Sequence, residues 1–378
     1  MSSNITIGLV GDVYLGEGTP LRLDASVSRL LATFDLVIAN QEGPICAGGK
    51  PVSGKCVLRS APKAAQVLRD WGVDVVTLAN NHMFDMGLSG FDETRRRLDA
   101  VGIHHLGAGG NVQEASAPLT LDVKGLSIGL LAYSWERIET TCATRAQFGC
   151  APLNHDMMLE ATRRLAREVD FVIVLPHWGY CDYEYPPPEH LILGRQLLGA
   201  GATAVVGHHS HVVQGVVADQ RGVLACSLGN FAMAHFTSLG RGIDFSAENF
   251  RGMVAVLQLA RGHPAACDTA FTRQQDDRIT VDNSPRRRQI LRKRSRLLKA
   301  SNYESHWRRY VHARLLRRLV YWSNILNWRK LRRQTLMGGR VMFRSMLGKA
   351  GATDRRQKPD STGPKGTGGH GGHTDHAS

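Results

Sequence analysis

Five short apolar runs in this sequence each end in residues whose side chains can bind a metal ion or transfer a proton. These residues are Asp12, Asn40-Gln41-Glu42, Asn80-Asn81-His82, His177 and His208-His209-Ser210-His211. Carboxylate, amide and imidazole groups are the ligands of hydrolytic metal sites, which also keep one position open for water. The residue types therefore indicate a hydrolytic metal site, provided that the fold brings the five clusters together.

The runs that precede these clusters predict buried strands, because they are short, rich in Val, Ile and Leu, and bounded by breakers. They cover residues 5–11, 36–39, 73–79, 171–176 and 203–206, and four of them have the composition of parallel strands. Helical spacing predicts helices at about 64–71, 89–102, 156–168 and 189–200. This alternation predicts an α/β fold, in which the carboxyl ends of the strands form the ligand crevice.

The remaining chain divides by composition. Further β-like runs at residues 215–218, 223–226 and 253–259 predict antiparallel strands that complete a second sheet. We expect a body over residues 1–262, a linker over 263–285, a basic amphipathic helical region over 286–347 and a disordered tail over 348–378. The tail is predicted to be disordered because it holds too little apolar surface to pack.

The histidine cluster at residues 208–211 is the most specific of the five. In an extended segment, His209 and His211 point to the same side, so both imidazoles can face one centre. Asp85 follows His82 by three residues and could orient its imidazole, as carboxylates around metal sites do. These two pairs predict metal ligands and a proton-transferring or charge-stabilising group in one place.

Taken singly, the other clusters have plainer interpretations. Asp12 after a glycine is also typical of a turn or a helix cap, and the lone His177 is typical of a structural histidine. Glu42 is as weak a signal on its own. Asp12, Glu42 and His177 therefore favour a metal site only as part of the set that the sheet gathers.

The net charge of +14 is unevenly distributed. Residues 285–378 hold 24 Lys and Arg against 4 Asp and Glu, whereas residues 1–284 hold 23 against 29. The body is therefore mildly acidic and needs a separate explanation from the basic end. The seven cysteines are an odd number without CxxC spacing, which favours free thiols and a cytoplasmic location, although a bridge between Cys46 and Cys56 or between Cys142 and Cys150 would fit an exported body.

The basic region has an apolar stripe at helical spacing. The stripe consists of Trp307, Val311, Leu315, Leu319, Trp322 and Leu326, mostly flanked by arginines. Such a helix suits the surface of an anionic membrane, and we expect residues 286–347 to bind one. A helical hairpin packed on the body or on a partner is the alternative. The interleaved tryptophans and the absence of a nucleic-acid motif disfavour nucleic acid as the partner.

Together these motifs resemble the bacterial capsule-synthesis family called CapA or PGA-cap, within the calcineurin-like metallophosphoesterase superfamily. The matching residues are Gly11-Asp12-Val13, Asn40-x-Glu42-x-Pro44, Leu78-Ala79-Asn80-Asn81-His82-x-x-Asp85-x-Gly87, Gly107-x-Gly109, His177-Trp178-Gly179 followed by Glu184-Tyr185, Gly207-His208-His209-x-His211-Val212 and Ser227-Leu228-Gly229-Asn230-Phe231. They span residues about 5–260, so the resemblance covers the body and leaves out the basic end.

The resemblance implies a four-layer α/β/β/α sandwich with a metal site at one edge of the sheets. It implies one or two divalent ions (Mn, Fe or Zn), with the ligands Asp12, Glu42, Asn81, His177, His209 and His211. It also implies that His82, oriented by Asp85, stabilises the transition-state charge or protonates the leaving group. The sequence departs from the superfamily pattern at Tyr14, where a histidine is usual, and at Glu42, where an aspartate is usual.

These expectations lead to two main functional hypotheses, beside a third in which the body is a regulatory module recruited through the basic tail. The first is a metal-dependent hydrolase, acting on a phosphoester or on an anionic polymer of the poly-γ-glutamate type, in capsule biosynthesis at the inner face of the cell membrane. The second is a non-catalytic assembly or export factor that keeps the same shell and contacts an acidic polymer or a capsule synthase. Tyr14 favours the second hypothesis, and the retained ligands favour the first.

Overall fold

Two β-sheets pack face to face in the computed structural model, which describes residues 4–235, 237–238, 241–242 and 245–325. The larger sheet has the order β2 (Arg22–Leu23), β19 (Arg278–Val281), β18 (Ala266–Gln275), β17 (Arg251–Ala260), β1 (Asn4–Tyr14), β3 (Leu36–Gln41), β4 (Val75–Thr77) and β5 (His104–Leu106), with β14 (Asn230–Met233) also paired to β1. The smaller sheet has the order β12 (Val216–Asp219), β13 (Gly222–Ala225), β11 (Ala204–Val206), β10 (Phe171–His177), β8 (Leu126–Ser134) and β7 (Leu119–Val123). Two short ribbons pair β6 (Ala108–Gly109) with β9 (Gly149–Cys150) and β15 (Thr237–Ser238) with β16 (Arg241–Gly242).

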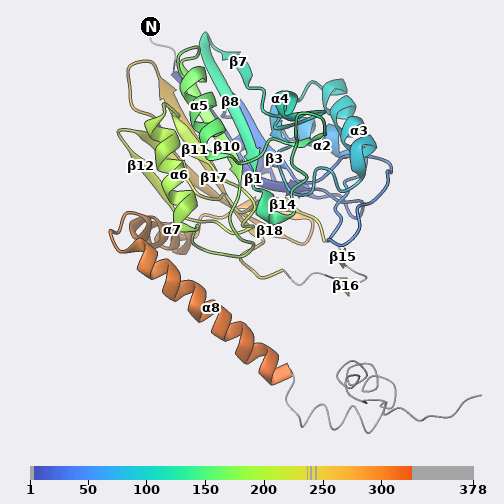
Figure 1. Cartoon of the computed structure of the whole chain (residues 1–378), viewed down its shortest axis with the longest axis vertical. Helices are drawn as coiled ribbons and strands as arrows, with labels where there is room; N and C mark the ends of the chain where they lie inside the picture. The colour runs from blue at the N-terminus through green and yellow to red at the C-terminus, as the bar shows by residue number, and fades with distance from the viewer. Residues whose placement is uncertain (1–3, 236, 239–240, 243–244, 326–378) are drawn as a thin grey trace, which may run out of the picture. The chain divides into compact units, whose positions relative to one another are not determined.

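Helices cover the outer face of each sheet (Figure 1). The helices α1 (Ala25–Leu31), α2 (Ala64–Asp70) and α3 (Gly87–Ala100) pack on the larger sheet, and α5 (His155–Leu165) and α6 (Pro188–Gly199) pack on the smaller one. The short α4 (Val112–Ala115) and the 3-10 turn η1 (Glu136–Ile138) lie in connections, and α7 (Pro285–Leu298) and α8 (Tyr303–Ile325) follow the last strand.

Three hydrophobic cores hold these layers together. The middle core lies between the sheets and joins residues such as Ile7 and Leu9 to Ile128 and Ile173. The other two cores lie between each sheet and its helices. The predicted four-layer α/β/β/α sandwich is confirmed, because the three cores separate four successive layers: helices, larger sheet, smaller sheet and helices.

Parallel pairing aligns the strand ends that carry the polar clusters. The strands β1, β3, β4 and β5 run parallel, as do β8, β10, β11 and β13. The four predicted helices form within a few residues of the expected bounds. The predicted strand at residues 253–259 is antiparallel but joins the first sheet beside β1, and β13 pairs in parallel with β11.

The linker expected at residues 263–285 is wrong. These residues form β18 and β19, which extend the larger sheet by antiparallel pairing with β17. The compact unit continues to Tyr310, beyond the predicted body boundary at residue 262. Because these strands are polar and near the edge of the sheet, their alternation is weak: β18 reads ACDTAFTRQQ and buries only its second half well.

Part of the basic region packs on the body. Arg287 donates two hydrogen bonds to the carboxylate of Glu248, at 3.0 and 2.9 Å, and Arg294 donates one of 2.7 Å to Glu184. Leu298 is fully buried. Helix α7 is therefore a structural element of the body, as the packed alternative predicted. Residues 326–347 of the predicted helical region and the predicted disordered tail at 348–378 lie outside the described residues.

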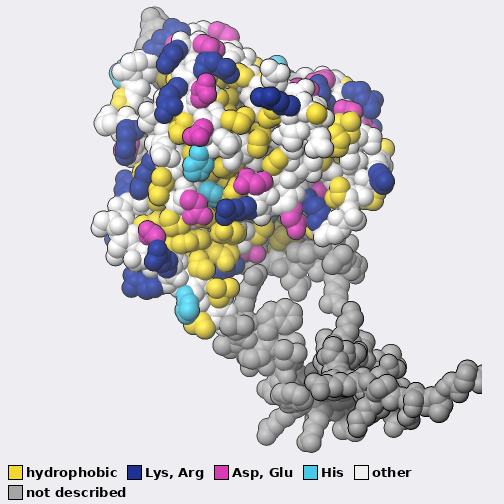
Figure 2. Space-filling view, in the orientation of Figure 1, with side chains coloured by type: hydrophobic (Ala, Val, Ile, Leu, Met, Phe, Trp, Pro, Cys, Tyr) yellow, Lys and Arg dark blue, Asp and Glu magenta, His cyan; other side chains and the backbone are white. Residues whose placement is uncertain are grey.

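The surface charges of the body are mixed. Figure 2 shows basic and acidic side chains interspersed over one face, as the near balance of 23 against 29 charges predicts. Trp307, the first residue of the predicted apolar stripe, is half-buried and stacks on Tyr180 with ring centroids 6.4 Å apart. Among the helices that the structure describes, none combines the length and the hydrophobicity needed to cross a bilayer.

Candidate metal centre

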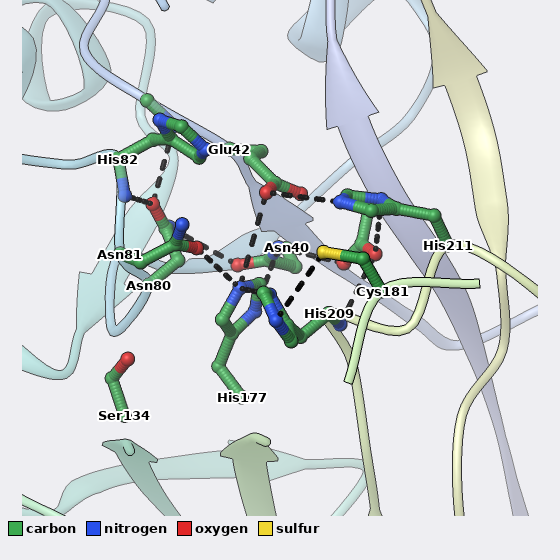
Figure 3. Close-up of polar contacts among 12 residues, drawn as sticks. Asn40, Glu42, Asn80, Asn81, His82, Ser134, His177, Cys181, His209 and His211 are labelled. Carbon is green, nitrogen blue, oxygen red and sulfur yellow. Dashed lines mark hydrogen bonds and ion pairs between the residues drawn. The ribbon is translucent and has the colours of Figure 1, made fainter. Parts of the chain in front are cut away.

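The ends of β1, β3, β4, β10 and β11 meet at one edge of the two sheets. Figure 3 shows side chains of this edge, among them Glu42, His177 and His211, pointing toward one another. Asp12 lies near the end of β1, Glu42 directly follows β3, and Asn81 follows β4. The smaller sheet contributes His177, the last residue of β10, and His209 and His211, which follow β11. The structure thus brings together all six residues that were predicted to be ligands.

Asp12 is held rigidly at the base of the site. It is fully buried, its Oδ1 accepts a 2.8 Å hydrogen bond from Asn40 Nδ2, and its Oδ2 accepts one of 3.2 Å from the His209 backbone N–H. Burial alone would raise the pKa of Asp12, but the neighbouring His211 outweighs it, so the pKa lies below its ordinary value. Asp12 is therefore an ionised, oriented carboxylate.

Asn40 and Asn80 are positioning residues that the sequence did not single out as such. Asn40 Oδ1 accepts a 3.2 Å hydrogen bond from Asn80 Nδ2, and Asn80 Oδ1 accepts from the backbone N–H groups of Gly43 and His82. Both are buried. This amide chain fixes the loops after β3 and β4 relative to Asp12.

Glu42 is the most unusual group in the site. It is fully buried, yet neither of its carboxylate oxygens has a hydrogen-bond partner in the described part of the chain. Its Oε1 lies 3.9 Å from His177 Nε2 and 3.7 Å from His211 Nε2. Burial raises its pKa well above the ordinary value, and the nearby Asp12 adds to this effect. Burying a carboxylate in this way is costly unless a cation or a donor offsets its desolvation.

His177, His209 and Asn81 form a cluster of nitrogen and oxygen donors beside Glu42. His177 Nε2 lies 3.0 Å from Asn81 Oδ1 and 3.2 Å from His209 Nδ1. Burial, together with the surrounding imidazoles, lowers the pKa of His177 well below its ordinary value. A neutral imidazole keeps a lone pair for a metal ion, so His177 has the protonation state that ligation requires.

The pKa of His211 is shifted in the opposite direction from that of His177. His211 Nδ1 lies 3.3 Å from Asp12 Oδ2 and 2.8 Å from Asn230 Oδ1. Burial lowers its pKa, but the carboxylates of Glu42 and Asp12 outweigh burial and raise the pKa well above the ordinary value. Without an ion, the proton on His211 offsets the charge of the ionised Asp12, 3.3 Å away.

The backbone of the histidine loop differs from the extended segment that we expected. His209 has φ of 89° and His211 has φ of 56°, both in the left-handed region that residues with side chains rarely adopt. The two imidazoles do face one site, but a strained turn places them there. Such strain costs about 1–3 kcal/mol per residue and is concentrated at functional sites.

His82 and Asp85 form a pair at the side of the site, as predicted for an oriented imidazole. His82 Nδ1 lies 2.6 Å from Asp85 Oδ2. The other carboxylate oxygen of Asp85, Oδ1, lies 2.7 Å from Lys55 Nζ. The backbone N–H of Leu58 donates a 2.8 Å hydrogen bond to Asp85 Oδ2. Burial lowers the pKa of His82 despite Asp85, so its imidazole is predominantly neutral at pH 7.

The sequence did not indicate Cys181, which lies in the loop after β10. Its Sγ is 3.6 Å from His209 Nε2. Although the residue is exposed as a whole, desolvation of the sulfur raises its pKa, but His209 and His211 lower it more, so the pKa is well below the ordinary value. The loop has no periodicity that could have predicted this placement. Tyr14, at the position where a histidine is usual, donates a 3.3 Å hydrogen bond to the Arg59 carbonyl.

The donor set fits a divalent ion. Three groups of side chains each place their ligand atoms within 4.8 Å of one another: Asp12, Glu42 and His211; Glu42, His177 and His209; and Cys181, His209 and His211. Each two of these groups have one residue in common: Glu42, His209 or His211. Such overlapping groups suit one ion or two neighbouring ions. The unpartnered oxygens of Glu42 are the polar atoms that such an ion would satisfy.

Residues 6–235 match the family described as bacterial capsule synthesis protein PGA_cap. The chain belongs to this family. A relative, capsule biosynthesis protein CapA of Bacillus anthracis, is 28% identical over 247 residues, covering 61% of this chain and 60% of that protein. The PGA biosynthesis protein CapA of Bacillus subtilis is 27% identical over 239 residues, covering 60% and 63%. The match thus spans less than two thirds of either relative.

Two solved structures are also similar. A hypothetical protein from Thermus thermophilus has a TM-score of 0.45 and 20% identity, covering 72% of this chain and 100% of that chain. A putative 5'-nucleotidase from Staphylococcus aureus has a TM-score of 0.44 and 14% identity, covering 77% of this chain and 58% of that chain. Membership of the family rests on the sequence match, and the four layers are seen directly in the fold.

Proposed function

We propose that this chain is a metal-dependent hydrolase that cleaves a phosphoester during the synthesis of a capsule or a related exopolymer. The observation that carries the proposal is Glu42, a buried carboxylate without a hydrogen-bond partner among the described residues, between His177 and His211. Burying such a group is costly unless it meets a cation. A purely structural core would not retain it.

The residues that would hold the ions are the six predicted ligands. Asp12, Glu42 and His211 suit one position, and Glu42, His177 and His209 suit a second, with the Asn81 oxygen beside His177. Mixed oxygen and nitrogen donors admit manganese, iron or zinc. When bound, such an ion polarises a phosphoryl oxygen and activates water.

His82 would move a proton in this reaction. Asp85 accepts the Nδ1–H of the neutral imidazole, which leaves the lone pair on Nε2. That nitrogen can take a proton and return it to the leaving oxygen. Lys55 and the backbone N–H of Leu58 fix Asp85, and through it the ring orientation.

The relatives' names support the biological setting. Two are named as capsule or PGA biosynthesis proteins, so an anionic polymer of the poly-γ-glutamate type and a capsule synthase are proposed partners. We further propose a cytoplasmic location and contact with an anionic membrane surface through residues 286–347. Since Arg287 and Arg294 are engaged with the body, that contact would use exposed residues such as Arg292 and Lys293.

A non-catalytic assembly or export factor is the second candidate. It is favoured by Tyr14, whose hydroxyl is hydrogen-bonded to the Arg59 carbonyl and which replaces a usual ligand. In that case the shell would bind an acidic polymer or a synthase without turnover. The two candidates differ in whether the loaded protein hydrolyses any bond.

The test is a substrate screen of the full chain loaded with manganese, iron or zinc. Chromogenic phosphomonoesters and phosphodiesters are assayed beside poly-γ-glutamate, with a chelator control and the His209→Ala variant. We expect chelator-sensitive phosphoester hydrolysis that His209→Ala abolishes. Amide cleavage alone would replace the phosphoester assignment, and equal turnover by the variant would refute a role for the site. A metal-loaded protein without turnover on any substrate would favour the assembly factor.

A further inference from the structure

A thiol stands beside the histidines of the candidate metal centre. Cys181 is exposed, and its ligand atom lies within 4.8 Å of those of His209 and His211. The other exposed or half-buried cysteines belong to no such group among the described residues. Among the described cysteines, Cys181 thus has the position of a possible metal ligand.

The loop that carries Cys181 is held in place. Asp182, the next residue, has φ of 63°, and its backbone N–H donates a 2.8 Å hydrogen bond to the Ser210 carbonyl. Its carboxylate accepts a 2.7 Å hydrogen bond from Asn249. The loop after β10 and the histidine loop after β11 are thereby joined directly beside the thiol.

The distances match those of a metal ligand. For bond lengths of about 2.3 Å to sulfur and about 2.05 Å to nitrogen, a tetrahedral ion separates these two ligand atoms by about 3.6 Å, whereas a right-angled site separates them by about 3.1 Å. Cys181 Sγ lies 3.6 Å from His209 Nε2. The observed spacing fits the tetrahedral arrangement, and in the metal-free protein it is also that of a hydrogen bond between the thiol and the imidazole.

A second observation points to an ion at the same place. His211 belongs both to the group with Cys181 and to the group with Asp12 and Glu42. Glu42 is fully buried, both its oxygens are unpartnered within the described chain, and Oε1 lies 3.7 Å from His211 Nε2. The thiol therefore adjoins a buried carboxylate whose charge calls for a cation.

We propose that Cys181 is a metal ligand of this centre and that its thiolate gives the site a preference for zinc or another thiophilic ion over manganese. This inference rests on the proposed function, because it assigns a further ligand to the same site. Tyr14 supplies no imidazole at the position where a histidine is usual, and its hydroxyl donates to the Arg59 carbonyl. Thiolates select soft ions, whereas carboxylates alone suit manganese.

The thiolate–metal bond has its own spectroscopic signature. The full chain is loaded with cobalt(II), and the near-ultraviolet thiolate-to-cobalt charge-transfer absorption is recorded beside the visible bands of bound cobalt. We expect charge transfer in the original chain, its loss in Cys181→Ser and its retention in Cys267→Ser, a matched control on β18. The visible bands should persist in both variants.

The possible outcomes separate the two proposals. Visible bands without charge transfer in the original chain would overturn the role of Cys181 and leave the metal centre intact. No bound cobalt in the original chain would overturn both. A second readout needs no variant: bound zinc should protect Cys181 from alkylation by iodoacetamide relative to the zinc-free protein, as measured by peptide mass spectrometry. Equal alkylation of Cys181 with one zinc ion bound would contradict ligation.

Discussion

Replacing Glu42 with glutamine should stabilise the metal-free protein and weaken its response to metal. Glu42 is fully buried without a hydrogen-bond partner among the described residues, and burial raises its pKa well above the ordinary 4.5. The folded protein therefore binds this proton more tightly than the unfolded chain does. As a result, the stability of the metal-free protein falls as pH rises above 4.5, until the raised pKa is passed.

The size of this effect has an upper bound. Each pH unit between 4.5 and the folded-state pKa costs about 1.4 kcal/mol, so the cost at pH 7 is at most about 3.4 kcal/mol. Glutamine removes this cost but also loses the attraction to His211. We therefore expect Glu42→Gln to gain about 1–3 kcal/mol without metal. An ion at one hundred times its Kd should add about 2.7 kcal/mol to the original chain, and much less to the variant.

Urea unfolding at pH 7 measures both free energies: with a chelator it gives the stability of the metal-free protein, and with excess zinc it gives the stabilisation by the ion. The variant should be the more stable protein in chelator, and zinc should narrow or reverse the difference. Glu168→Gln, at an exposed position on the body, is the matched control and should follow the original chain in both conditions. The reasoning fails if Glu42→Gln destabilises the metal-free protein, or if zinc stabilises both proteins equally.

The remaining predictions concern proton transfer, pH dependence and the docked helix. His82→Gln should lower kcat about 10²–10⁴-fold on any phosphoester that the screen identifies, with metal content unchanged, and Asp85→Asn should change the pH profile of kcat; unaltered kinetics would exclude this pair. Burial lowers the pKa of His190 to about 3. Between pH 6.5 and 3 this histidine is therefore protonated in the unfolded chain but not in the folded protein, so the free energy of unfolding decreases as the pH falls through this range. His190→Gln should flatten that dependence by about 1.4 kcal/mol per pH unit in urea unfolding, and an unchanged slope would count against it. Arg294→Leu should cost about 1–3 kcal/mol in the same assay, because it removes buried hydrogen bonds between α7 and the body; the exposed Arg292→Leu should cost almost nothing, and equal losses would argue against docking.

The residues that could be placed from sequence are those fixed by parallel strands. Asp12, Glu42 and His177 follow short buried runs, and the carboxyl ends of such strands meet at one edge. The histidine loop faces the site, but not as the extended segment that alternation predicts. His209 and His211 face the site through left-handed backbone conformations, which period-two alternation does not describe.

The features that sequence reasoning missed depend on tertiary contacts. The pair β7 and β8 went unassigned, although β8 lies inside the smaller sheet next to β10. The strands β18 and β19, near the edge of the larger sheet, have a polar composition with little alternation, which predicts a linker. Cys181 reaches the site only because its loop is tied to the loop after β11. No local spacing encodes that contact.

The central claim is that these side chains bind a divalent ion, and metal stoichiometry tests it most directly. Elemental mass analysis compares the full chain, His209→Ala and a control with alanine at His370, His373 and His376, which could hold metal nonspecifically. We predict one or two ions per chain in the original and control proteins, and their loss in His209→Ala. No bound ion in the original chain after metal supplementation, or full occupancy in His209→Ala, would contradict the claim.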